Sequence, residues 1–193
     1  MKNKILLIVG RTCTGKDTLA HELEKAGYVA VKSYTTRPRR YDGEDTHIFI
    51  TAKEAASIVD KVATTTINGY EYFATRKQLE QCGLYIIDPN GLYELIRNCP
   101  DVEFLVVHVT ADFNTSLEKA VIRSSNQHEA EIFKKRYASE NTQFAAFEEC
   151  IAGNDHISDN CHVLYRYKNN FTFEKLNAAL DVIIKNLESE ELV

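Results

Sequence analysis

Short apolar runs alternate with amphipathic stretches along most of the chain. The runs are continuous, as is typical of strands that are buried on both faces. They cover residues 5–9, 28–31, 84–87, 102–109 and 162–167. Between them, apolar residues recur at helical spacing after residue 15, over 112–123, over 129–151 and after residue 175. This order predicts an α/β fold in which helices cover both faces of a parallel sheet.

The segment from about 33 to 75 interrupts this alternation. Thr51 and Thr75 are each followed three residues later by Glu or Gln, and these two capping boxes predict short helices. The first helix is expected to end near residue 60 and the second at Gly83. Two further runs, 62–67 and 70–74, flank an Asn-Gly pair and predict a β-hairpin. We expect a small insertion at the carboxyl edge of the sheet, where open α/β sheets bind ligands.

The first apolar run leads directly into a glycine-rich loop. Residues 10–18 match the phosphate-loop pattern G-x-x-x-x-G-K-[ST], except that Asp17 stands where Ser or Thr is usual. Loop N–H groups, the start of the next helix and the Lys16 ammonium all attract phosphate oxygens. We expect Lys16 to bind the terminal phosphates of a nucleotide and Thr18 to bind Mg²⁺ or a phosphate. The other predicted cofactor-binding residues are Gly10, Arg11, Thr12, Cys13, Thr14, Gly15 and Asp17.

A second cluster of positive charge follows the phosphate loop. Residues 31–40 include no acid and four bases: Lys32, Arg37, Arg39 and Arg40. Pro38 disfavours helix at Arg37 and keeps the backbone extended, so Arg37 and Arg40 can converge on one anion. The forked donors of arginine match a phosphate monoester. A solvated basic loop is the alternative. Two phosphate-binding sites in one chain, here called stations, indicate a phosphoryl donor and an acceptor.

Composition narrows the range of partners. The 193 residues include 23 Lys and Arg against 28 Asp and Glu, and a net charge of −5 argues against a nucleic-acid-binding surface. No run reaches the roughly 18 apolar residues of a membrane span, and the first run is too short for a signal peptide. The five cysteines are scattered, as in reduced cytosolic proteins. We expect a cytoplasmic monomer or homodimer with no nucleic-acid or membrane partner.

The chain resembles the guanylate kinase family of nucleoside monophosphate kinases over most of its length. The resemblance rests on the phosphate loop and on the stretches 33–40, 43–49, 69–75 and 86–91, in that order. It implies one P-loop NTPase-type α/β domain over 1–193, with ATP and Mg²⁺ as cofactors and small nucleotides as substrates. The implied parts are a core (1–32, 76–121 and 141–193), a monophosphate-binding insertion with the hairpin (about 33–75) and a helical lid (about 122–140).

The resemblance also assigns roles to single side chains. It implies that the acceptor phosphate is bound by Ser33, Arg37, Arg40 and Tyr72. Asp88 matches an acid that reads the base or orders water around Mg²⁺, and capping of the turn at Pro89 is the alternative. Arg123 and Arg136 match lid arginines that stabilise the transferring phosphoryl group, with a solvated helix arginine as the alternative for each. Asn169 matches a contact with the adenine edge, and an ordinary loop asparagine is the alternative.

Departures from the family pattern concern the acceptor. Ala63 and Ala74 stand where the family has a glutamate and a serine that bind guanine, and Thr46 stands where it has a phosphate-binding tyrosine. A lost base-reading hydrogen bond weakens discrimination about ten- to hundredfold. The expected function is ATP-dependent phosphorylation of a nucleoside monophosphate, first GMP or dGMP. The alternatives are a kinase for ribose 1,5-bisphosphate or another deoxynucleotide, and a non-catalytic guanylate-kinase-like module, which typically lacks the lysine that this chain keeps.

Overall fold

The computed structural model describes residues 3–67, 69–124 and 128–189, and a five-stranded sheet forms their centre. Its first four strands run parallel and the last pairs antiparallel with its neighbour. The strand order is β6 (Leu84–Ile87), β1 (Asn3–Val9), β7 (Val102–Thr110), β9 (Cys161–Lys168) and β8 (His156–Ser158). The predicted α/β fold with a parallel sheet between helices is confirmed.

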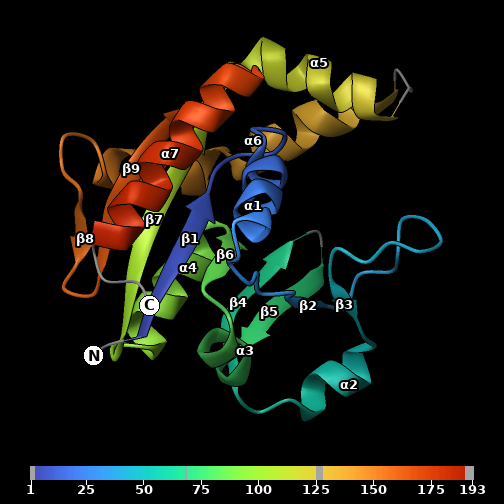
Figure 1. Ribbon diagram of the computed structural model, residues 1–193. Helices are drawn as coiled ribbons and strands as arrows, with labels where there is room; N and C mark the ends of the chain where they lie inside the picture. The colour runs from blue at the N-terminus through green and yellow to red at the C-terminus, as the bar shows by residue number, and fades with distance from the viewer. Residues whose placement is uncertain (1–2, 68, 125–127, 190–193) are drawn as a thin grey trace.

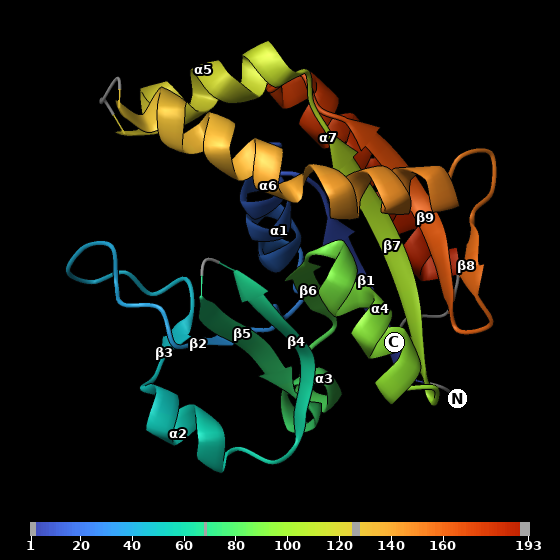
Figure 2. The same cartoon turned by 180° about the vertical axis from the view of Figure 1, so that it is seen from behind.

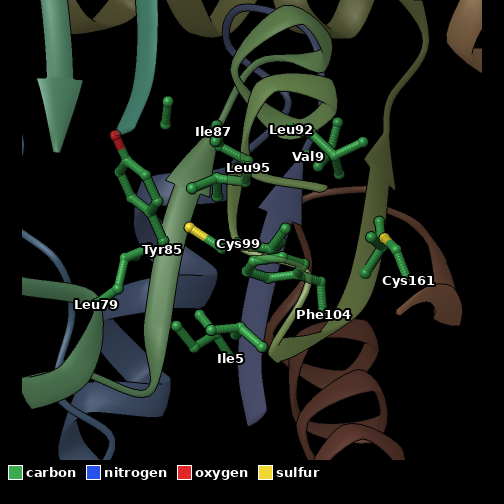
Figure 3. Packing of buried hydrophobic residues seen from close by; sticks show 14 of the residues in the cluster. Ile5, Val9, Leu79, Tyr85, Ile87, Leu92, Leu95, Cys99, Phe104 and Cys161 are labelled. Atoms are coloured by element: carbon green, nitrogen blue, oxygen red, sulfur yellow. The ribbon is translucent and has the colours of Figure 1, made fainter. Parts of the chain in front are cut away.

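Successive residues of β1 point into two separate apolar layers, since side chains alternate across a strand. Leu6 and Ile8 pack with α1 (Lys16–Lys25) and α7 (Phe173–Ser189) on one face. On the other face, Ile5, Leu7 and Val9 pack with α4 (Pro89–Asn98) and α6 (His128–Cys150). Figure 1 shows α7 and α1 in front of the sheet, and Figure 2 shows α4 and α6 from behind. Figure 3 shows Val9 beside Leu92 and Leu95 of α4.

A smaller four-stranded sheet lies beside the core. Its order is β3 (Ile48–Phe49), β2 (Tyr34–Thr35), β5 (Tyr70–Thr75) and β4 (Lys61–Ile67). β4 and β5 pair antiparallel over the ranges where the sequence predicts a hairpin, and β4 packs on α4. The short helices α2 (Ala52–Ser57) and α3 (Arg76–Gln81) both begin with the predicted capping boxes.

Two helices form an arm at the carboxyl end of the main sheet. α5 (Phe113–Ser124) runs outward, and the N-terminal half of α6 returns beside it. Aromatic contacts join the pair, because the Phe113 ring lies 5.5 Å from that of Phe133 and 4.9 Å from that of Tyr137. None of the helices in the described ranges combines the length and hydrophobicity that a membrane span requires.

Several predicted elements differ from the structure. Residues 28–31 do not form a strand, because they make only one bridge, from Ala30 to Leu84, and Val29 is 58 % exposed. The helix after Thr51 ends at Ser57 rather than near residue 60, since the backbone of Ile58 is extended. The sequence patterns also missed α4 and β8. α4 begins with Asp-Pro-Asn-Gly, which reads as a turn, although proline at the first helical position is favourable.

Candidate functional site

The loop between β1 and α1 has the close backbone packing of a phosphate cradle. A Cβ at Gly10 would lie 2.3 Å from the carbonyl oxygen of Val109, and a Cβ at Gly15 would lie 2.3 Å from Asn169 Nδ2. Gly15 also has a φ of 93°, which is left-handed, and Cys13 adopts a φ of 57°. Gly10 is therefore required by space, and Gly15 by space and by conformation.

Lys16 lies folded back over this loop. Its Nζ donates a hydrogen bond of 2.7 Å to the carbonyl oxygen of Arg11, which also accepts from Thr14 Oγ1 at 2.9 Å. Burial lowers the pKa of Lys16, and the nearby carboxylates of Asp17 and Glu140 oppose part of that change. A partly desolvated ammonium gains from an incoming anion, because a nearby opposite charge favours its charged form.

Asn169 supports the loop from beneath. Its Nδ2 donates to the carbonyl oxygen of Thr14 at 2.9 Å, and its Oδ1 accepts from Tyr167 Oη at 2.8 Å and from the N–H of Phe171 at 2.7 Å. The side chain is buried. These contacts give Asn169 a role in the shape of the cradle, and the predicted contact with adenine stays a prediction.

Arg11 ties the loop to α6. Its guanidinium donates to both carboxylate oxygens of Glu148, at 3.2 and 3.0 Å, and to Asn141 Oδ1 at 3.2 Å. It also lies over the rings of Tyr137 and Phe144, 5.1 and 5.2 Å from their centres. The side chain of Arg11 therefore binds the helix, and only its backbone faces the predicted nucleotide site.

The second predicted station is built around a buried ion pair. Arg37 donates to both oxygens of Glu44, at 3.1 and 2.8 Å, and Glu44 is only 2 % exposed. Arg37 Nε donates to Tyr72 Oη at 3.1 Å, and Nη1 donates to the carbonyl oxygen of Pro38 at 2.7 Å. The Arg37 guanidinium lowers the pKa of Glu44 to about 2, assisted by the Arg40 N–H and the Thr46 hydroxyl. Most donors of Arg37 thus face protein groups.

Arg40 keeps its charged group available. Its backbone N–H donates to Glu44 at 2.7 Å, whereas its side chain is 55 % exposed and approaches Glu44 only to 3.9 Å. Burial lowers the pKa of Arg40, and Arg37 and Arg136 add to this effect. Arg40 is therefore the arginine of this station that can turn toward an incoming phosphate.

His47 belongs to the same station, and the sequence patterns did not single it out. Its Nδ1 lies 2.9 Å from the hydroxyl of Ser33, and its ring lies edge-on to Tyr72 with 5.4 Å between the centres. Burial lowers the pKa of His47, and Arg37 lowers it further. Thr46, where the family has its tyrosine, instead donates to Glu44 at 3.1 Å. His47 lies within the stretch 43–49 on which the resemblance rests, so that stretch is the sequence signal that could have identified it.

The two stations lie near one another. Arg136 of α6 lies close enough to Lys16 and to Arg40 to lower the pKa of each, although burial has the larger effect on both. Asp17 of α1 lies close enough to His47 to oppose the lowering of its pKa. Figure 1 shows the insertion and the α5–α6 arm on the same side of the core, with α1 between them. Arg136 thus lies near both the predicted donor site and the predicted acceptor site.

Two predicted metal residues lie in different surroundings. Thr18 is exposed on the first turn of α1. Asp88 caps α4, because its Oδ1 accepts from the N–H groups of Asn90 and Gly91 at 2.9 and 3.2 Å, and burial raises its pKa. In the described ranges, no group of three His, Cys, Asp or Glu side chains could hold a metal ion. Mg²⁺ that arrives on substrate phosphates needs only one or two protein ligands, so these oxygen donors fit it.

Arg123, the other predicted lid arginine, lies in α5, but its side chain and residues 125–127 fall outside the described part of the chain. Its predicted contact with the transferring group stays a prediction. The same holds for the outer end of the predicted lid.

Comparisons with known proteins support the fold. No model of a protein family matches the sequence, and no curated protein matches it. Among solved structures, guanylate kinase from Anaplasma phagocytophilum is similar with a TM-score of 0.54 and 16 % identity, over 100 % of this chain and 89 % of that chain. TT1252 from Thermus thermophilus gives a TM-score of 0.49 and 13 % identity, over 97 % and 99 % of the two chains. The first likeness supports a guanylate-kinase-like fold.

Proposed function

We propose that this chain transfers the γ-phosphoryl group of ATP to a nucleoside monophosphate, with GMP or dGMP as the first acceptors to test. One observation supports this most: a phosphate cradle with a half-buried lysine and a second cationic station both lie near Arg136 of α6. A single anion-binding site would serve a hydrolase or a binding module, whereas two facing sites serve transfer. The guanylate-kinase-like fold agrees with this function.

In this reaction an oxygen of the acceptor phosphate attacks the γ-phosphorus, and the bond from that phosphorus to the β-phosphate oxygen breaks, leaving ADP. Little covalent chemistry falls to the protein, so positioning and charge neutralisation supply most of the rate. The loop amides and Lys16 hold the donor phosphates. Arg136, with Arg123 as the second predicted lid arginine, balances the charge of the phosphoryl group in transit.

On the acceptor side, Arg40, Ser33, Tyr72 and His47 hold the phosphate. Arg37 acts mainly through others, because its pair with Glu44 fixes the backbone of Arg40 and its Nε orients the hydroxyl of Tyr72. Bound Mg²⁺ would neutralise charge on the donor phosphates, and Thr18 and Asp88 are the oxygen donors that would hold it. Closure of the insertion against the α5–α6 arm excludes water from the space between the two stations.

A second acceptor class is favoured by one specific observation. Ala63 and Ala74, at the positions where the family binds guanine, are 2 % and 0 % exposed, and the backbone of Ala63 is left-handed with a φ of 55°. Neither side chain can offer a hydrogen bond to a base. A small phosphorylated sugar such as ribose 1,5-bisphosphate needs no such contact, so it is the runner-up acceptor.

The test is ADP formation from ATP and Mg²⁺ against a panel of nucleoside monophosphates, deoxynucleoside monophosphates and sugar phosphates. We expect at least one acceptor to accelerate ADP formation, and Lys16→Ala to abolish that acceleration. Lys25→Ala, an exposed lysine at the other end of α1, is the matched control. Acceptor-independent ATP hydrolysis, or a Lys16→Ala variant as fast as the wild type, would contradict phosphoryl transfer.

A further inference from the structure

A carboxylate of the protein itself occupies part of the phosphate cradle. Oε2 of Glu140, on α6, accepts a hydrogen bond of 2.9 Å from the backbone N–H of Thr12. Thr12 is 6 % exposed and lies in the loop between Gly10 and Lys16. This N–H belongs to the set of amides that the proposed function assigns to the donor phosphates.

The same carboxylate lies among the cations of the donor site. Glu140 is close enough to Lys16 to oppose the lowering of the Lys16 pKa by burial. Arg136 precedes Glu140 by four residues on α6, so both lie on the face that Lys16 approaches. Glu140 thus provides the loop with what a phosphate would provide: an acceptor for an amide and a negative charge beside two cations.

The position of Glu140 is fixed by its neighbours on α6. Asn141 and Glu148 bind the guanidinium of Arg11, and the ring of Phe144 is 2 % exposed in the core. This half of α6 cannot swing away from the loop without breaking those contacts. The Glu140 side chain can leave the Thr12 amide by a change of rotamer, which costs far less than moving the helix.

From this geometry we propose that Glu140 is an internal competitor for the donor phosphates and thereby determines donor affinity. The inference rests on the proposed function, because it takes the loop to be the donor site. A polyphosphate that reaches the Thr12 amide breaks the contact to Glu140 and turns its carboxylate outward, since two anions cannot share one donor. Lys16 and Arg136 then have the phosphate beside them in place of the carboxylate, so the loop keeps a counter-charge in both states.

Titration calorimetry with ATP and with inorganic tripolyphosphate tests this. In Glu140→Gln the side chain keeps its shape and loses its charge, so we expect both ligands to bind about tenfold more tightly, or about 1.4 kcal/mol. Glu149→Gln removes the same charge from an exposed position on the same helix and should leave both dissociation constants unchanged. The N–H resonance of Thr12 supplies a second readout, because it should move in free Glu140→Gln and converge with the wild type at saturating tripolyphosphate.

Equal affinities of wild type, Glu140→Gln and Glu149→Gln would overturn the proposal, and so would weaker binding by Glu140→Gln, which would make the carboxylate a support of the loop. In both cases the wild type still binds polyphosphate, so the proposed function survives. If none of the three proteins binds either ligand, the inference and the proposed function fail together.

Discussion

Glu44→Gln is the substitution that most sharply tests how the predicted acceptor station is built. Glu44 is 2 % exposed and accepts from both Arg37 nitrogens, from the Arg40 N–H and from the Thr46 hydroxyl. Glutamine has the same size, but it removes the charge and presents an NH₂ group where an oxygen now accepts. Arg37, 9 % exposed, is then left without its counter-ion. We expect the free energy of unfolding to fall.

The loss of unfolding free energy follows from the buried ion pair and from the lowered pKa of Glu44. Removing one partner of a buried ion pair costs about 3–5 kcal/mol. The pKa of Glu44, lowered from 4.5 to about 2, corresponds to about 3.5 kcal/mol at roughly 1.4 kcal/mol for each pKa unit. Water screens the side of the pair that Arg40 covers, since that side chain is 55 % exposed, so we expect a loss of about 2 kcal/mol.

Urea denaturation followed by circular dichroism at pH 7 measures this loss, with Asp45→Asn as the control because Asp45 is 88 % exposed. Since the pKa of Glu44 is lowered in the folded state, its contribution is complete above pH 4.5 and disappears as the pH falls toward 2. Wild type should lose stability over that range more steeply than Glu44→Gln. A Glu44→Gln protein as stable as Asp45→Asn at pH 7, with the wild-type acid profile, would refute the reasoning.

Three further predictions concern the two stations and the loop. Arg40→Ala should raise the acceptor KM about ten- to hundredfold and leave the ATP KM within about twofold, since a charged hydrogen bond contributes about 1.5–3 kcal/mol. Steady-state kinetics measure both constants, and an equal rise in the two would contradict separate donor and acceptor stations. Asn169→Ala should lower the free energy of unfolding by about 2 kcal/mol and weaken ATP binding, because the Thr14 carbonyl and the Tyr167 hydroxyl lose their partner. An Asn170→Ala control in the same loop should bind ATP as the wild type does, and equal losses of ATP affinity in the two variants would count against a role of Asn169 in supporting the phosphate loop. Cys13→Gly should raise the free energy of unfolding in urea by about 1 kcal/mol, since a φ of 57° strains any side chain, whereas Cys82→Gly at an extended position should lower it. A lower free energy of unfolding in both variants would show that the packing of Cys13 outweighs its strain.

The sequence predicted those parts of the structure that depend on local pattern. Apolar runs identified four of the five core strands, because strands covered on both faces have few polar positions. The capping boxes at Thr51 and Thr75 were correct to the residue, since both partners lie within four residues of each other. β8 was missed because its three residues carry no apolar run, and residues 28–31 were wrongly predicted because an edge segment can be apolar without forming a ladder.

The site shows the same division. The phosphate loop and the roles of the arginines at 37 and 40 are predictions from short motifs. The contact between Thr12 and Glu140 joins residues 128 positions apart, and that between Arg11 and Glu148 spans 137, so no local spacing could predict either one. The different roles of Arg37 and Arg40 also depend on tertiary structure. Glu44 binds the guanidinium of Arg37 and leaves that of Arg40 exposed, and no local pattern shows this.

The proposed function requires that one ligand can reach both stations at once. Its most direct test is the affinity of a bisubstrate analogue, adenosine and guanosine joined by five phosphates, measured by calorimetry with wild type, Lys16→Ala and Arg40→Ala. We predict that the analogue binds at least a hundredfold more tightly than ATP or GMP alone and that each substitution removes most of that gain. An analogue that binds no better than ATP, and that Arg40→Ala leaves unaffected, would contradict the claim.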